Sequence, residues 1–144
     1  MNDMFIKNAT DVRKEWGSVI DTVVREKPVF VKRSRDIIYL LSQNNINQLL
    51  SNYTFTANAF TENDGSITLS LNEVDIAANG KDQAEALDIL ARDLQEYAEE
   101  YYAEFEYWYA SMNRKSHYPY ILRVLSTDDK EKLKELITCQ AGKS

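Results

Sequence analysis

Glu73 and Asp75 have the spacing that hydrolytic chemistry would use, because side chains two residues apart in a strand lie on one face. Paired carboxylates can hold a metal ion or act as general acid and general base. Two-metal hydrolysis also needs carboxylates from neighbouring elements, and no recognisable further set accompanies this pair on the predicted strands. The pair is therefore interpreted as solvated carboxylates at a sheet edge.

His117 and Cys139 are each the only residue of their type in the chain. A single histidine excludes a His-rich metal site, and a single cysteine excludes both a disulfide framework and a cysteine metal site. The four glycines form no phosphate-binding loop. The sequence accordingly predicts no enzyme activity, no metal and no cofactor.

Basic side chains are concentrated in the first quarter of the chain, around a predicted helix start and a predicted hairpin. If these elements pack side by side, the cations form one patch for phosphates and base edges of DNA. An ordinary solvated surface remains the alternative, because Asp11, Glu15 and Asp36 dilute the patch. The candidate DNA-binding residues are Lys7, Arg13, Lys14, Lys32, Arg33 and Arg35.

Charge is distributed unevenly over the 144 residues, whose formal net charge is −6. Residues 1–52 carry eight Lys/Arg and six Asp/Glu, whereas residues 53–110 carry two against thirteen, and residues 111–144 carry seven against four. A basic end beside an acidic middle suggests two surfaces with different partners. No apolar run is long enough to cross a bilayer, so a cytoplasmic protein is expected.

The first part of the chain predicts a short strand, one helix, a hairpin and a second short helix. Asn8 is placed to cap the first helix, with Asp11 as its box partner. Apolar residues then recur every three or four positions until Pro28, and Ser42 is placed to cap the second helix. The apolar stripe of the first helix comprises Val12, Trp16, Val19, Ile20 and Val23, and the hairpin strands comprise residues 29–31 and 37–41.

This segment resembles the N-terminal half of the Phd/YefM family of bacterial antitoxins. The matching stretches are Asn8-Ala9-Thr10-Asp11-Val12-Arg13 and Pro28-Val29-Phe30-Val31-Lys32-Arg33. The resemblance implies a homodimer that binds operator DNA, with Arg13 and Arg33 at the positions that serve the operator.

The remainder predicts a three-stranded sheet followed by a long helix. Residues 53–60 and 67–71 alternate as strands around the turn Glu62-Asn63-Asp64-Gly65, and residues 74–78 form the third strand. Apolar residues at helical spacing predict one unbroken helix from Lys81 to about Asn113. A last helix is expected from Thr127 through Ile137, with a frayed tail from Gln140.

This order of elements is similar to HicB-type antitoxins, whose folded part is a truncated ribonuclease-H-like unit. The matching stretches are Asn63-Asp64-Gly65-Ser66-Ile67-Thr68, Asn79-Gly80-Lys81-Asp82 and Ala84-Glu85-Ala86-Leu87. The chain is therefore predicted to be α+β, with a YefM-like β-α-β-β-α module in residues 1–52 and a HicB-like sheet, long helix and extra C-terminal helices in residues 53–144.

Aromatic and acidic residues interleave near the end of the long predicted helix. Tyr101, Phe105 and Trp108 are interpreted as core residues. Tyrosine is frequent at protein interfaces, so Tyr102, Glu106 and Tyr109 are candidate contacts for a toxin.

Taken together, these features predict an antitoxin of a type II toxin–antitoxin pair, RelB-like in role, that represses its own operon. The expected partners are operator DNA, a second copy or more of the chain, and a small basic RelE-type ribonuclease whose cationic site the acidic part would cover. Two alternatives stay open. One is a protein-interaction module without DNA binding, and the other is a ribonuclease-H-like enzyme using Glu73 and Asp75.

Overall fold

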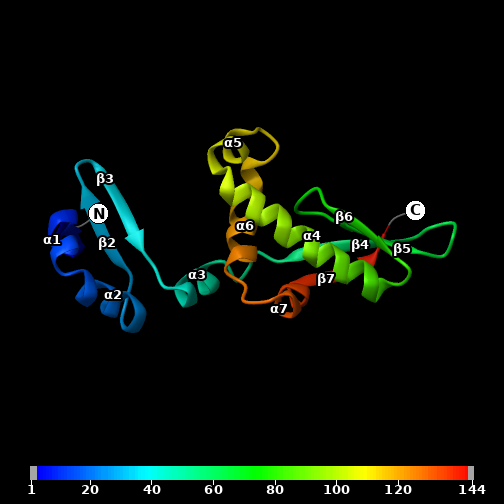
Figure 1. Ribbon diagram of the computed structural model, residues 1–144, viewed down its shortest axis with the longest axis horizontal. Coiled ribbons are helices and arrows are strands. Elements are labelled where there is room, and N and C mark those ends of the chain that lie inside the picture. The colour runs from blue at the N-terminus through cyan, green and yellow to red at the C-terminus, as the bar shows by residue number, and fades with distance from the viewer. Residues whose placement is uncertain (1–2, 143–144) are drawn as a thin grey trace. The chain divides into compact units, whose positions relative to one another are not determined.

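The computed structural model describes residues 3–142, which form an α+β fold with two mixed β-sheets (Figure 1). The chain divides into two compact units, the first ending at Leu49 and the second beginning at Leu50. Each unit has its own hydrophobic core. The two are described separately below as unit 1 and unit 2.

Unit 1 contains a three-stranded sheet in the order β1-β2-β3. Strand β1 runs parallel to β2, and β2 pairs antiparallel with β3 through a two-residue turn that places Arg33 opposite Asp36. Ser34 in this turn adopts a positive φ of 56°. The elements are η1 (Asp3–Phe5), β1 (Ile6–Asn8), α1 (Ala9–Lys14), α2 (Trp16–Arg25), β2 (Val29–Arg33), β3 (Asp36–Leu40) and α3 (Gln43–Leu49).

The first predicted helix is two helices. Asn8 caps α1 as expected, since its side chain accepts a hydrogen bond from the Thr10 N–H at 2.9 Å. The prediction of one continuous helix is wrong, because Glu15 leaves helical geometry (φ −112°, ψ 30°) and separates α1 from α2. Gly17 lies close to this break and lowers the helical preference of the segment.

The core of unit 1 consists of five buried valines, with Ala9 and Leu40 packed against them. Of the five apolar residues predicted to line one helix stripe, Trp16 is 51% exposed and Ile20 is 37% exposed. Trp16 and Ile20 belong to α2, in which only Val19 and Val23 are buried, so the apolar stripe of this helix is wider than its buried side. The buried valines are Val12, Val19, Val23, Val29 and Val31.

Unit 2 contains a four-stranded sheet in the order β6-β5-β4-β7. Its elements are β4 (Phe55–Thr61), β5 (Ile67–Leu71), β6 (Ala77–Gly80), α4 (Gln83–Ala103), α5 (Phe105–Ala110), η2 (Lys115–His117), α6 (Tyr118–Leu125), α7 (Lys130–Glu135) and β7 (Ile137–Ala141).

Strand β7 corrects the predicted three-stranded antiparallel sheet. It pairs parallel with β4, from Phe55 opposite Ile137 to Ala59 opposite Ala141. The segment was expected to end a helix and then fray, but α7 stops at Glu135 and the chain continues as a strand. A partner some eighty residues away in sequence leaves no local pattern, so only the tertiary structure shows this pairing.

The long predicted helix also ends early. Helix α4 stops at Ala103, and Glu104 (φ −121°, ψ 50°) separates it from α5. It begins at Gln83 rather than at the predicted Lys81, where the Asp82 side chain accepts a hydrogen bond from the Glu85 N–H at 2.9 Å. The third strand is β6, a few residues later than the predicted 74–78 strand, and residues 72–76 form a bend that buries Val74.

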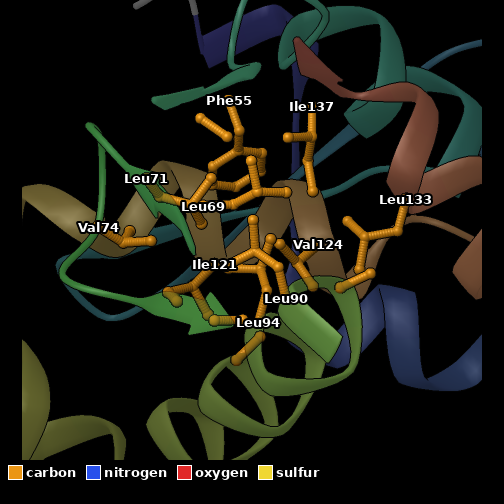
Figure 2. Packing of buried hydrophobic residues seen from close by; sticks show 14 of the residues in the cluster. Phe55, Leu69, Leu71, Val74, Leu90, Leu94, Ile121, Val124, Leu133 and Ile137 are labelled. Carbon is orange, nitrogen blue, oxygen red and sulfur yellow. The ribbon is translucent and has the colours of Figure 1, made fainter. Parts of the chain in front are cut away.

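Helix α4 covers one face of the sheet and forms the centre of the unit 2 core (Figure 2). Its close approach depends on Gly80, where an added Cβ would lie 2.4 Å from the Ala86 backbone nitrogen. Leu90 and Leu94 point from α4 into a cluster with Phe55 and Ile121, and all four are almost fully buried.

Candidate DNA-binding and partner-binding surfaces

Arg13 and Arg33 are brought together at the surface of unit 1. Arg13 lies in the last turn of α1, and Arg33 is the final residue of β2. Both line a small depression with Ala9 and Thr10, and both also line a larger one beside it. Two guanidinium groups from separate elements are therefore available at one place for an anionic ligand.

The other four predicted cations are exposed but are not shown to converge on this pair. Lys14, Lys32 and Arg35 lie at the surface of α1, β2 and the hairpin turn. Lys7 lines a different groove, with Phe5 and Phe30. Within residues 3–142, none of the six cations forms an ion pair, which leaves their charges uncompensated by a bound carboxylate.

An apolar stripe lies on the outer side of α2. Trp16, Ile20 and Val24 follow one another at four-residue spacing and are 51%, 37% and 66% exposed. Ile38 of β3, 57% exposed, lines the larger depression together with Trp16, Arg13 and Arg33. The sequence pattern indicated the apolar character of this helix but could not separate the buried stripe from the exposed one.

In unit 2, the aromatic residues near the end of α4 divide into packed and exposed groups. Tyr101 is fully buried, its hydroxyl donating to the Arg114 carbonyl at 2.9 Å and its ring stacking on Trp108 at 6.2 Å. Phe105 packs its ring edge against Tyr118 at 5.0 Å. These contacts agree with the interpretation of Tyr101, Phe105 and Trp108 as core residues.

The three candidate toxin contacts differ in their surroundings. Tyr102 is 67% exposed and Glu106 is also exposed. Tyr109 is less available, because its ring stacks on Phe105 at 5.3 Å and the Lys115 ammonium lies 5.1 Å from the ring centre.

The sequence did not single out Tyr107 and Met112, which are 64% and 93% exposed. We call the surface of Tyr102, Glu106, Tyr107 and Met112 the tip of unit 2. Figure 1 shows α5, which carries Glu106 and Tyr107, at the end of α4. The sequence around Glu104 contains no Gly or Pro and gave no signal that the helix ends there.

His117 is buried next to the tip, where it joins a polar cluster. Its Nδ1 lies 2.7 Å from the Tyr97 hydroxyl, which also accepts a hydrogen bond from Arg114 at 3.3 Å. Burial lowers the pKa of His117, and the Arg114 charge lowers it further, whereas Asp75 acts in the opposite direction. The cluster connects α4 to η2 and α6 and is structural.

Glu73 and Asp75 lie in the bend between β5 and β6. The Glu73 carboxylate accepts a hydrogen bond from the Thr56 N–H at 2.7 Å, and this bond connects the bend to β4. Among residues 3–142, no three His, Cys, Asp or Glu side chains gather in a way that could hold a metal ion.

Within the described residues, no helix combines the length and the apolar character needed to cross a membrane.

Comparison with known proteins gives one solved structure of high similarity. It is the crystal structure of a protein from Syntrophomonas wolfei subsp. wolfei, described as an antitoxin part of a provisionally assigned toxin/antitoxin system. The two chains are 38% identical and superpose with a TM-score of 0.89, over 94% of this chain and 98% of the other. No curated protein matches the sequence.

A family model matches residues 3–139, which is nearly the whole chain and spans both units. The family is described as Phd-like, the antitoxins of RelE/RelB toxin–antitoxin systems, and its members act without catalysis. The chain belongs to this Phd-like family of antitoxins of RelE/RelB toxin–antitoxin systems.

Proposed function

We propose that this antitoxin represses its own operon through unit 1 and neutralises a small basic RelE-type ribonuclease through unit 2. The observation that carries the first part is the convergence of Arg13 and Arg33 on one depression beside an exposed apolar stripe. We assign DNA binding to residues 1–52 and toxin binding to residues 53–144. The HicB-like character of the second part remains a prediction.

Operator binding requires two copies of unit 1. One copy offers few cations, and each phosphate contact contributes only a modest, salt-dependent free energy. A two-fold dimer presents the Arg13–Arg33 pair twice and matches the two halves of a palindromic operator.

We place the dimer contact on Trp16, Ile20, Val24 and Ile38. A domain of about fifty residues with five buried valines buries little of its apolar surface by itself, and exposed apolar patches of this kind usually mark an interface. Because Trp16 and Ile38 line the same depression as both arginines, dimerisation also sets the position of the cations on DNA.

Toxin neutralisation is assigned to the tip of unit 2 because it combines exposed aromatic area with negative charge. Glu99, Glu100 and Glu104 are exposed near it. Of the nearby cations, Arg114 is engaged over the Tyr97 and Trp108 rings, at 5.5 and 5.7 Å from their centres. The surface thus suits a cationic partner, which it would bind by aromatic contact and charge complementarity.

DNA binding is tested with the DNA upstream of the antitoxin reading frame, at several salt concentrations. Arg13→Ala/Arg33→Ala should abolish specific binding and lower the slope of log Kd against log salt by about 0.9 for each phosphate that the variant no longer neutralises. Arg92→Ala, which removes an exposed arginine from α4, is the matched control and should leave both unchanged. Wild-type protein that binds no better to this DNA than to unrelated DNA would favour the interaction-module alternative.

Toxin binding is tested by co-purification with the product of a neighbouring reading frame that encodes a small basic protein. Tyr102→Ala/Glu106→Lys should weaken the complex by more than about tenfold, as loss of an interface anchor and reversal of a rim charge do. Glu62→Lys, in the exposed β4–β5 turn, makes the same charge change elsewhere in unit 2 and should have little effect. If both variants weaken the toxin complex equally, the net charge of unit 2 rather than the tip determines toxin binding.

A further inference from the structure

Among residues 3–142, the strand residues on the face of the unit 2 sheet opposite α4 carry no charged side chain. Along each strand, alternate residues point into the core, and the residues between them are half-buried or exposed. We call this surface the open face. It consists of Thr56, Asn58, Phe60, Thr68, Ser70, Asn72, Ala77, Asn79, Thr138 and Gln140.

The absence of charge on the open face is unusual for this chain, because 28% of its residues are charged and unit 2 is acidic overall. A basic toxin or a nucleic acid gains no electrostatic attraction from such a surface. A second copy of the same chain is the partner that a neutral face suits best, since two units of net negative charge can meet there without like-charge repulsion at the contact.

Three amide side chains cross the centre of the open face as a hydrogen-bonded relay. The Gln140 amide N–H donates to the Asn58 oxygen at 2.8 Å, and the Asn58 amide N–H donates to the Asn72 oxygen. Within residues 3–142, the Asn72 amide N–H and the Gln140 amide oxygen have no partner. The relay therefore has a donor at one end and an acceptor at the other, and reversing all three amides only exchanges the two ends.

Two copies of this relay complement each other when they run in opposite directions, because the free donor of each then meets the free acceptor of the other. A two-fold axis in the plane of the interface, passing through Asn58 at right angles to the relay, brings the donor end of one copy to the acceptor end of the other. Phe60 lies beside the relay in a shallow pocket with Asn58, Asn72 and Gln140, and offers an apolar anchor for the same contact.

We propose that the open face binds the open face of a second copy, with Asn58 at the two-fold axis. This contact is separate from the apolar stripe of unit 1, so the two together join antitoxin dimers into larger assemblies. In projection, four strands of five residues cover roughly 300 Å², whereas stable interfaces bury about 800 Å² per partner. The contact is therefore weak, and copies already held close together on DNA or through unit 1 would form it most readily.

The test is sedimentation velocity of the full chain over a roughly hundredfold range of concentration, without DNA or toxin. Wild-type protein should show an association step beyond the species formed through unit 1. Asn58→Asp and Asn58→Lys each place two like charges together at the axis and should weaken this step by more than about tenfold. An equimolar mixture of the two variants should restore it, because the charges on the axis are then opposite.

Two further variants keep the result interpretable. Asn63→Asp, in the exposed β4–β5 turn, adds the same charge away from the open face and should behave as wild type. Thr138→Lys changes an exposed residue of the open face outside the relay and should weaken the step even if the Asn58 variants fold poorly. Far-ultraviolet circular dichroism establishes which variants are folded.

Three outcomes would overturn the proposal. The first is a folded Asn58→Asp or Thr138→Lys variant that associates as wild type does, and the second is a mixture that recovers nothing. The third is unchanged association together with loss of toxin binding, which would make the open face a toxin site. The first two outcomes leave the proposed repression and neutralisation untouched, because no DNA or toxin is present in the sedimentation experiment. The third outcome, measured by toxin co-purification of the same variants, would count against the tip as the toxin site.

Discussion

Unit 1 and unit 2 differ in how much of their apolar surface they bury. Unit 2 places large side chains, including Phe55, Leu94 and Tyr101, in a single core at 1% exposure or less. Unit 1 buries five valines and leaves Trp16 and Val24 more than half exposed. From this comparison we expect unit 2 to be stable by its own packing and unit 1 to be stabilised by the dimer contact proposed above.

The largest expected effect comes from breaking the unit 2 core. Phe55, the first residue of β4, is 1% exposed and packs against the Tyr120 ring. Phe55→Ala should therefore destabilise unit 2 by about 4 kcal/mol through reduced burial and an unfilled cavity. Hydrogen exchange should show reduced protection of α4 and β4 amides. Thr61→Ala, at the exposed end of the same strand, is the control and should leave protection intact.

The dimer proposed for unit 1 predicts a different response. Its amide protection should rise with protein concentration, by about 1.4 kcal/mol per dimer for each tenfold increase, and unit 2 amides in the core should not follow. Val24→Asp should remove this dependence and leave unit 1 poorly protected. Asp21→Ala, on the exposed surface of the same helix, serves as control. If the amide protection of wild-type unit 1 does not depend on concentration, its core of five valines is sufficient to stabilise it without a dimer.

A pair of helix caps sharpens the comparison with a smaller effect. Asn8 caps α1 in unit 1, and Asp82 caps α4 in unit 2, each through one hydrogen bond of 2.9 Å to a backbone N–H. Replacing either by alanine should cost about 1 kcal/mol. The stability lost in Asp82→Ala should appear as a lower free energy of global unfolding of unit 2 by urea, because α4 spans its core. The Asn8→Ala loss should appear mainly as weaker dimerisation and DNA binding.

The smallest expected effect is a pH dependence confined to unit 2. Burial and Arg114 hold the pKa of His117 below its usual value of 6.5, so the unfolded state binds the proton more readily than the folded state. Neutral His117 makes its full contribution to the free energy of unfolding of unit 2 above pH 6.5, and this contribution is lost as the pH falls through the lowered pKa. Urea unfolding at several pH values should show this slope, and His117→Gln should remove it. If the unfolding free energy of the variant depends on pH as strongly as that of the wild type, the pH dependence comes from carboxylates and not from His117.

Local chemistry was sufficient to predict much of this protein from its sequence. The caps at Asn8 and Ser42, the hairpin strands at residues 29–31 and 37–41, and the Glu62–Gly65 turn all depend on neighbouring residues. The α+β class followed from the order of these elements, and the prediction of an antitoxin followed from the resemblance of the quoted stretches to known antitoxin families. The candidate DNA-binding and toxin-binding residues remain predictions that the experiments above test.

Only the tertiary structure decided the features that depend on distant residues. The breaks at Glu15 and Glu104 occur within good helical patterns, because packing rather than propensity sets where each helix leaves its neighbours. Strand β7 forms because β4 offers a free edge far away in sequence. The same long-range pairing brings Gln140 beside Asn58 and creates the open face. The sequence by itself determined which side chains are apolar, charged or able to cap, and the fold decided which of them meet.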